Sequence, residues 1–483
     1  MMKLHIWGGA GEHGRSCYLI AGERHQILLD CGVKKEDEGQ YPLLDPEIIP
    51  QLTAVFLSHA HEDHSMALPL LYKYGYKGDI WTTKATVEQL SSYFASWRRY
   101  VKERGAELPY TEEQIAALSF RDLEDLAPAL QWADLDLDEE QKLDLESDSD
   151  SDLDSVGAAA PNLPRIRLKW GRSGHLAGSV WLRLEVEGRR IFFSGDYSRE
   201  SLLLAADSPL EGEAGEGGSP FSKGAVHRVH NQAADQAKPS GYAADLVIMD
   251  NAYGSDEEPQ ETKLRELERA VRNTLESGGH VLLPVPVYGR GQDLLVWASE
   301  RLGTYNLIVE EKIWNGLQRL LEQPVWLQTK GRERIQQAIN SSAGRVILPH
   351  NDEERLEALN EKGPSVIFTA DGMMESPRAR WYFKYLADHV RNTVIITGHA
   401  ARHTFAQNIL EGGMEEARCK FFNIRYKVHQ GLSDVREMLR EVPAEQTVLV
   451  HASKPKTDEV CEVLAGEGYR RIHSLKPGAE LMF

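Results

Sequence analysis

Residues 58–67, SHAHEDHSMA, concentrate side chains that bind metal ions. The segment HxHxDH at 59–64 directly follows the apolar run TAVFLS, which we expect to be a buried strand. In a tight loop after a strand, His59 and His61 can converge on one ion, and Asp63 and His64 on a second. This spacing differs from HExxH, in which two histidines share one helical face. A solvated polar loop is the weaker alternative, because four ligand-type residues stand together here.

Six residues cannot complete two metal sites, and further ligand-type residues stand near other apolar runs. His175 lies in the loop SGHLAGSVW, Asp196 follows IFFSG, and His451 follows TVLV. Ligands in α/β sheets bind beyond the carboxyl ends of strands, so we expect these residues to converge. The Asp196 carboxylate can bridge two ions. Asp30, which ends QILLD, is expected to orient a ligating histidine. All these donors are nitrogen or oxygen, which favours zinc, with manganese or iron as alternatives.

Length and composition set broad limits. A chain of 483 residues with 41% hydrophobic residues can form two or three domains with a sizeable core. No apolar run of 18 residues and no apolar signal segment is present, so we expect a cytoplasmic protein without a membrane span. The four cysteines are scattered and form no CxxC pair, which argues against disulfides and against a thiolate zinc site.

The net charge of −19 is unusual for a protein that binds nucleic acid. Residues 134–155, however, hold 11 acidic residues and one lysine, so they supply −10 of it. We expect a disordered acidic insertion at 134–160 and a flexible loop at 207–243 that is rich in Gly, Ser and Ala. The overall charge is therefore a poor guide to the partner.

The ordered parts alternate between short apolar runs and helical patterns. The runs QILLD, TAVFLS, RIFFSG, DLVIMD, HVLLPV, SVIFTA, TVIITG and TVLVHA predict buried strands, and residues 263–275, 293–302 and 433–441 predict helices. The fold class is therefore α/β.

The ordered series of motifs resembles a known family. Asp30, residues 59–64, His175 and Asp196 resemble the four sequential motifs of the metallo-β-lactamase fold. DNAYG (250–254), VYGRGQDLL (287–295) and ADGMMESPRAR (370–380) resemble segments of its β-CASP group of nucleic-acid-processing nucleases, as do GHAARHTFAQNIL, YKVHQGLSD and VLVHASKP further on. The resemblance implies an αββα sandwich with an inserted α/β β-CASP domain. The expected division is a core at 1–206, a β-CASP domain at 207–398 and a return to the core at 399–483.

The resemblance also implies roles for individual residues. It places His59, His61 and His175 on one Zn²⁺, Asp63, His64 and His451 on the other, and Asp196 between them, with Mn²⁺ as an alternative metal. Asp63 also counts among the catalytic residues. His429 is implied as the general acid and Asp250 as the carboxylate that orients it. His451 favours RNA over DNA, because this position is a histidine in RNA-processing members of the group.

The implied activity is zinc-dependent hydrolysis of RNA phosphodiester bonds by a metal-activated hydroxide, with cuts made inside single-stranded RNA. Basic and polar residues expected to contact the substrate are Arg290, Ser376, Arg378, Arg380, Thr404 and Lys454, with Tyr253 or Tyr288 for base stacking. A homodimer is compatible with the resemblance.

Two other functions remain open at this point. A small-molecule hydrolase for thioesters or lactones would use the same metal core, although a small substrate needs no inserted domain. A catalytically silent RNA-binding scaffold is the second alternative, although the ligand set is complete.

Overall fold

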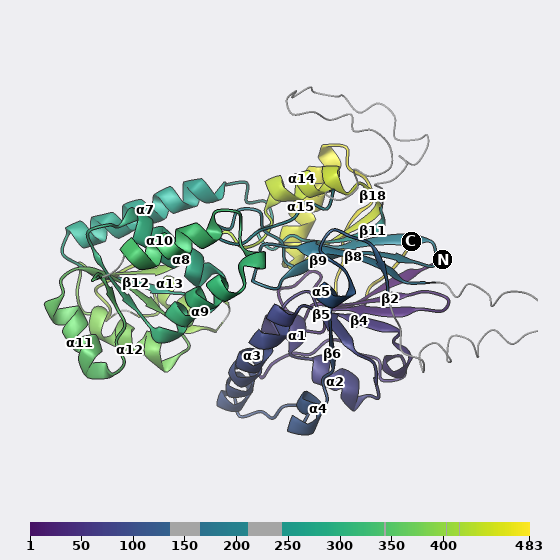
Figure 1. The fold of residues 1–483 in the computed structure, drawn as a ribbon, viewed down its shortest axis with the longest axis horizontal. Helices are drawn as coiled ribbons and strands as arrows, with labels where there is room; N and C mark the ends of the chain where they lie inside the picture. The colour runs from purple at the N-terminus through teal and green to yellow at the C-terminus, as the bar shows by residue number, and fades with distance from the viewer. Residues whose placement is uncertain (136–164, 211–243, 342–343, 402, 415) are drawn as a thin grey trace, which may run out of the picture.

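The computed structural model describes residues 1–135, 165–210, 244–341, 344–401, 403–414 and 416–483. The expected acidic insertion at 134–160 and the expected loop at 207–243 lie almost wholly outside these described residues. The described chain forms a core of two facing sheets and a second lobe built on a third sheet (Figure 1).

The first core sheet is formed mainly by the N-terminal part of the chain. Its strands β1, β2 and β3 are antiparallel neighbours, whereas β3, β4, β5 and β6 are parallel. In spatial order they are β20 (Glu480–Met482), β1 (Lys3–Gly8), β2 (Cys17–Ala21), β3 (Gln26–Leu29), β4 (Ala54–Phe56), β5 (Ile80–Thr82) and β6 (Phe120–Asp122).

The second core sheet combines strands from distant parts of the chain. Its β10, β11, β18 and β19 are parallel, and β10, β9, β8 and β7 are antiparallel. The order is β19 (Ile472–Ser474), β18 (Ala444–Val450), β11 (Ala244–Asp250), β10 (Arg189–Phe193), β9 (Val180–Val186), β8 (Arg167–Arg172) and β7 (Ala133–Asp134).

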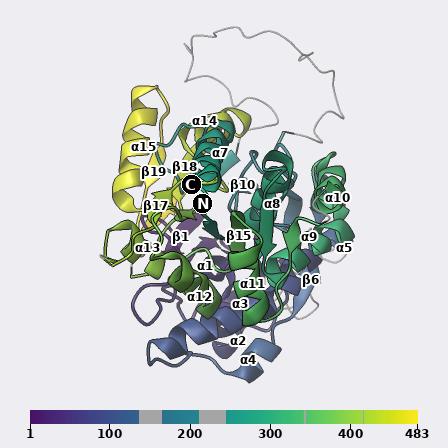
Figure 2. The ribbon, with the colours of Figure 1, turned by 90° about the vertical axis from the view of Figure 1, so that its left-hand side faces the viewer.

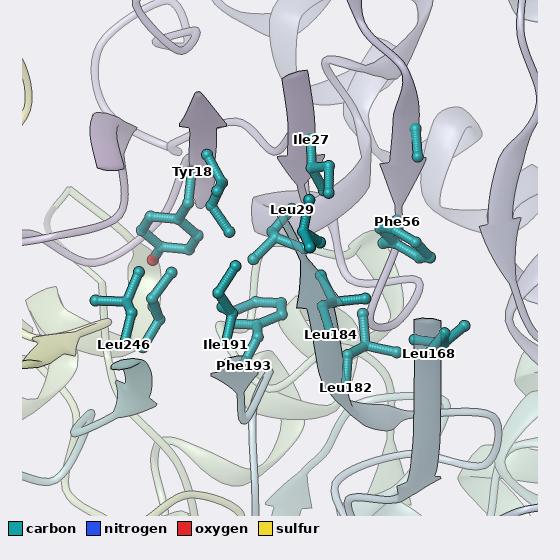
Figure 3. Close-up of a cluster of buried hydrophobic side chains, with 14 of the residues drawn as sticks. Tyr18, Ile27, Leu29, Phe56, Leu168, Leu182, Leu184, Ile191, Phe193 and Leu246 are labelled. Atoms are coloured by element: carbon teal, nitrogen blue, oxygen red, sulfur yellow. The ribbon is translucent and has the colours of Figure 1, made fainter. Parts of the chain in front are cut away.

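The core lies between the two sheets (Figure 3). Side chains along β9 alternate between the two faces of the sheet. Val180, Leu182, Leu184 and Val186 enter this core, whereas Trp181 packs on the opposite face. Side chains from the first sheet that meet them include Tyr18, Ile27, Leu29 and Phe56. Because a one-residue slip would turn these side chains to the other face, burial fixes the strand register.

Helices cover both outer faces of the sandwich, one set toward the top and the other toward the bottom in both views (Figures 1 and 2). Side chains of α2 (Leu68–Lys73) and α3 (Lys84–Glu103) pack on the first sheet, and those of α14 (Leu432–Glu441) and α15 (Lys454–Gly466) pack on the second. Short elements complete this part: η1 (Ile49–Gln51), α1 (Glu62–Ser65), α4 (Glu112–Ala116) and α5 (Leu123–Leu126). The expected αββα sandwich is confirmed.

The second lobe is an α/β layer with a parallel six-stranded sheet. Its order is β14 (Val346–Ile347), β13 (Asn306–Val309), β15 (Ser365–Thr369), β12 (Val281–Pro284), β16 (Thr393–Ile396) and β17 (Lys420–Asn423). The accompanying helices are α7 (Gln260–Glu276), α8 (Arg290–Arg301), α9 (Glu311–Glu322), η2 (Pro324–Trp326), α10 (Gly331–Ser341), α11 (Asp352–Glu361), α12 (Pro377–Leu386) and α13 (Phe405–Leu410). None of the described helices is long and apolar enough to cross a membrane.

The sheet pairing bears on how the chain is divided. Strand β11 pairs with β10 and β18 of the core, and β17 pairs with β16 of the second lobe. We therefore propose that the inserted domain begins after Asp250 and ends after Asn423, instead of at the expected boundaries 207 and 398.

Candidate metal centre

The ligand-type residues lie where core strands end. Asp30 follows β3, His59 lies three residues after the end of β4, and Asp196 lies three residues after the end of β10. Asp250 closes β11, and His451 directly follows β18. Asp30 and His451 adopt left-handed backbone conformations, with φ of 57° and 68°. Such values are uncommon for residues other than glycine and are often found at functional sites.

Close backbone packing holds the HxHxDH loop in place. The amide of Ser16 donates to the carbonyl of Asp63 over 2.8 Å, and the amide of Cys31 donates to the carbonyl of His64 over 2.8 Å. A Cβ at Gly32 would lie 1.8 Å from the Asp63 carbonyl oxygen. Only glycine therefore permits the chain after β3 to approach α1 this closely.

Three histidines and one aspartate form the first group of ligand atoms: His59, His61, His175 and Asp196. His61 Nδ1 lies 3.1 Å from His59 Nε2 and 2.9 Å from His175 Nε2. The Asp196 Oδ2 atom lies 3.4 Å from His59 Nε2 and 3.5 Å from His175 Nε2. Four donor atoms therefore face one point.

Hydrogen bonds determine which ring nitrogens carry protons in this group. Ser58 Oγ donates to Asp30 Oδ2 over 2.8 Å, so it accepts from His59 Nδ1, 3.0 Å away. His175 Nδ1 donates to the Val428 carbonyl over 2.7 Å. The Nε2 atoms of neutral His59 and His175 therefore present lone pairs toward His61 Nδ1, whose single proton could satisfy only one of them. A cation satisfies all three nitrogens.

The second group consists of Asp63, His64 and His451. His451 Nε2 lies 3.0 Å from Asp63 Oδ2, and His64 Nε2 lies 3.9 Å from the same oxygen. His64 Nδ1 donates to Asp30 Oδ2 over 2.6 Å, which leaves His64 Nε2 as the ligand atom. Asp30 accordingly orients two histidines: His64 directly, and His59 through Ser58.

Asp196 connects the two groups. Its Oδ1 lies 3.3 Å from His64 Nε2, and its Oδ2 lies 3.8 Å from His451 Nε2. Oδ2 is buried and has no hydrogen-bond partner among the described residues. A buried carboxylate oxygen without a donor is costly unless a cation compensates it. The donor set thus fits two divalent ions that share Asp196, and nitrogen and oxygen donors are those that zinc accepts.

The pKa shifts agree with this arrangement. Burial lowers the pKa of His59, His61 and His175, in the last case to about 4, so these rings are neutral and able to bind metal near pH 7. Burial also opposes a charge on His451, but the carboxylates of Asp196 and Asp63 raise its pKa to about 9. The carboxylates of Asp196, Asp30 and Asp63 likewise raise the pKa of His64, so both histidines of the second group attract a proton when no cation is bound.

His429 and Asp250 adjoin the metal ligands. His429 Nδ1 lies 3.1 Å from Asp250 Oδ2 and 3.7 Å from Asp196 Oδ2. The fully buried Asp250 accepts hydrogen bonds from the amides of Tyr197, Gln430 and Ala252, which fix its position. The His429 ring also stacks on His451, with the centroids 5.0 Å apart.

Most of the residues expected to contact substrate have protein partners. Ser376 and Thr404 are N-caps of α12 and α13, and their hydroxyls accept from the amides of Ala379 and Gln407. Arg378, Arg380 and Lys454 form ion pairs with Asp352, Glu375 and Asp458. Arg290 differs, because its buried Nε has no partner within the described chain. Substrate contact by these residues stays a prediction.

Sequence reasoning missed residues whose importance depends on tertiary position. Tyr93 of α3 packs against His61, with the ring centroids 5.5 Å apart, and contacts Tyr288 at 6.4 Å. His13 stacks on His399 at 5.2 Å and lies 6.1 Å from His451. The position of His13 in the glycine-rich loop after the first apolar run was the only local signal for it.

Comparison with known families accords with this geometry. The model of the Metallo-beta-lactamase superfamily matches residues 10–272, and that of the Beta-Casp domain matches residues 301–409. The chain belongs to the metallo-β-lactamase superfamily. Within it, the chain is of the β-CASP type and is a metal-dependent hydrolase.

Similar proteins span nearly the whole chain. "Transcription termination factor FttA" of Methanothermobacter thermautotrophicus is 24% identical, over 98% of this chain and 70% of that protein. "RNase J-like protein" of Methanocaldococcus jannaschii is 24% identical, over 94% of this chain and 93% of that protein. "Endoribonuclease YSH1" of Eremothecium gossypii is 23% identical, over 92% of this chain and 54% of that protein. A crystal structure of a protein of unknown function from Enterococcus faecalis has the same fold, with a TM-score of 0.54, 12% identity and full coverage of both chains.

Proposed function

We propose that this protein is a zinc-dependent ribonuclease that hydrolyses phosphodiester bonds within single-stranded RNA. The observation that carries the proposal is the pair of ligand groups with Asp196 between them, next to the His429–Asp250 pair. The names of two relatives, an endoribonuclease and an RNase J-like protein, support RNA as the substrate.

The residues assigned to the two Zn²⁺ ions follow the two groups. His59, His61 and His175 would hold one ion, and Asp63, His64 and His451 the other, with Asp196 shared between them; Mn²⁺ is the alternative metal. When bound, the two ions would activate water for attack on phosphorus and neutralise charge on the phosphate oxygens.

His429 is proposed as the general acid. Its Nδ1 donates to the anchored Asp250, which holds the ring in one orientation. The opposite nitrogen, Nε2, can then donate a proton to the departing oxygen of the ribose. This role requires the half-buried ring to meet the substrate beside the metal ligands, where the contact with His451 places it.

An aromatic surface extends from the first ligand group toward the second lobe. The Tyr93 ring packs beside His61, and the Tyr288 ring packs beside Tyr93. Arg319 Nη1 donates to the Tyr288 hydroxyl over 3.0 Å. Tyr288 and Arg319 also line a pocket together with Ala85, Gln89 and Ala177 of the core. Rings beside a cation suit unpaired bases and their phosphates, so this surface supports a single-stranded substrate.

The test uses purified, metal-analysed protein with 5′-labelled single-stranded RNA and a DNA of the same sequence. We expect internal RNA cuts that a chelator abolishes and that added Zn²⁺ restores. Inert RNA together with hydrolysis of a thioester or lactone would replace the proposal with a small-molecule hydrolase. RNA binding without cleavage of any substrate would indicate a scaffold.

The expected cytoplasmic location and homodimer stay predictions.

A further inference from the structure

The metal centre has a basic flank on the side of His451. His13, from the loop after β1, stacks on His399, which lies between β16 and α13, with an interplanar angle of 26°. His13 also meets the edge of His451 at 6.1 Å. Two imidazoles from different lobes therefore continue the row of rings that begins with His175, His429 and His451.

Two cationic side chains adjoin this row. Arg425 lies over the ring of Tyr253 at 6.0 Å, and Tyr253 contacts His429 at 5.4 Å. Lys456, in the first turn of α15, packs beside Gly254, where an added Cβ would lie 3.5 Å from the lysine Cβ. The two cations thus flank consecutive residues, Tyr253 and Gly254, directly after the strand that supplies Asp250.

The charges on this flank are only partly offset by the protein. Among the described residues, neither Arg425 nor Lys456 forms an ion pair, although both are half-buried. Of the acids that act on Lys456, Asp256 already pairs with Lys263 at 2.8 Å, and Glu459 is exposed and forms no ion pair with the lysine among the described residues. Holding two like charges near each other without a close counter-ion is unfavourable, so the arrangement suits an anion supplied from outside.

We propose that Arg425, Lys456, His13 and His399 form a subsite for the backbone phosphodiester next to the scissile one. The inference rests on the proposed ribonuclease function, and it specifies on which side of the metal centre the RNA chain continues. Arg425 and Lys456 supply charge, and the two imidazoles supply ring N–H donors. Because such contacts go to the backbone, they position the strand without reading its bases.

The first test compares the variants Arg425→Ala, Lys456→Ala and their double with wild type. On an RNA oligonucleotide, we expect KM to rise about tenfold or more in each single variant, with kcat little changed, because each loses a hydrogen bond to a charged group. The slope of the logarithm of the RNA-binding constant against the logarithm of the salt concentration should fall in magnitude by about 0.7 for each lost phosphate contact. Hydrolysis of bis-p-nitrophenyl phosphate, which has no flanking phosphate, should be unchanged. Exposed Arg470→Ala and Lys330→Ala serve as matched controls that remove the same charges elsewhere.

A second test needs no protein variant. Wild type is given RNA in which one phosphate beside the cleavage site is replaced by an uncharged methylphosphonate, on each side in turn. We expect one of the two positions to raise KM as the double variant does, and that position to have no further effect in the double variant. Equal cleavage of all three RNAs by wild type, or a KM in the variants equal to that in the controls, overturns the subsite. Failure of wild type to cleave any RNA would instead overturn the proposed function.

Discussion

Replacing Asp30 by asparagine should weaken metal binding although Asp30 is not itself a proposed ligand. The Asp30 carboxylate accepts from His64 Nδ1 over 2.6 Å, from Ser58 Oγ over 2.8 Å and from the Ser58 amide over 2.7 Å. An asparagine of the same size can accept from the amide through its oxygen, but its NH₂ group then faces two donors. His64 would relieve this conflict by moving its proton to Nε2, and Ser58 would no longer fix the tautomer of His59.

The expected loss follows from the two altered ligands. Removing a group that orients a metal ligand typically lowers metal affinity about 10- to 100-fold, or about 1.4–2.8 kcal/mol. Two histidines depend on Asp30, so we expect the upper part of this range. The assay is zinc titration of the metal-free protein against a competing chelator, with RNA turnover measured in parallel. Asp293→Asn is the matched control, because Asp293 is another buried aspartate, whose Oδ2 accepts from Tyr426 and Ser201. Wild-type zinc affinity in Asp30→Asn would refute the proposed tautomer control.

Three further predictions concern the centre and the second lobe. Asp196→Asn should lose activity and at least one of the two metal ions, as measured by elemental analysis of the dialysed protein; two retained ions would contradict the shared-ligand role. His429→Gln should keep its metal but lose about 10²- to 10⁴-fold in kcat, so a metal-free variant would contradict the general-acid role. Burial raises the pKa of Asp293 to about 6 from its usual 3.8. As the pH falls, Asp293 is therefore protonated in the folded state before it is protonated in the unfolded state. Above pH 6, the ionised carboxylate lowers the free energy of unfolding by up to about 3 kcal/mol. Relative to wild type, Asp293→Asn should be more stable at pH 8 than at pH 5 in urea unfolding; a pH-independent difference would contradict the shift.

Much of the fold could be predicted from local patterns. Strands buried on both faces, such as β11 and β12, appear as continuous apolar runs, and the expected helices lie within or overlap α7, α8 and α14. Strands such as β7 and β14, with two residues each, are too short to show a period and were missed. The inserted lobe was expected to end at 398, but β17 still pairs in its sheet, because strand pairing is a long-range property.

The sequence by itself determined the chemical type of the centre. The spacing HxHxDH, together with His175, Asp196 and His451, supplies nitrogen and oxygen donors in a fixed order, and this information is local. Only the tertiary structure decided which atoms face one another. His451 meets Asp63 across 388 residues, Ser58 links Asp30 to His59, and His13 of the core stacks on His399 of the second lobe. These contacts depend on how two sheets and an inserted lobe pack, and no spacing within one segment encodes that packing.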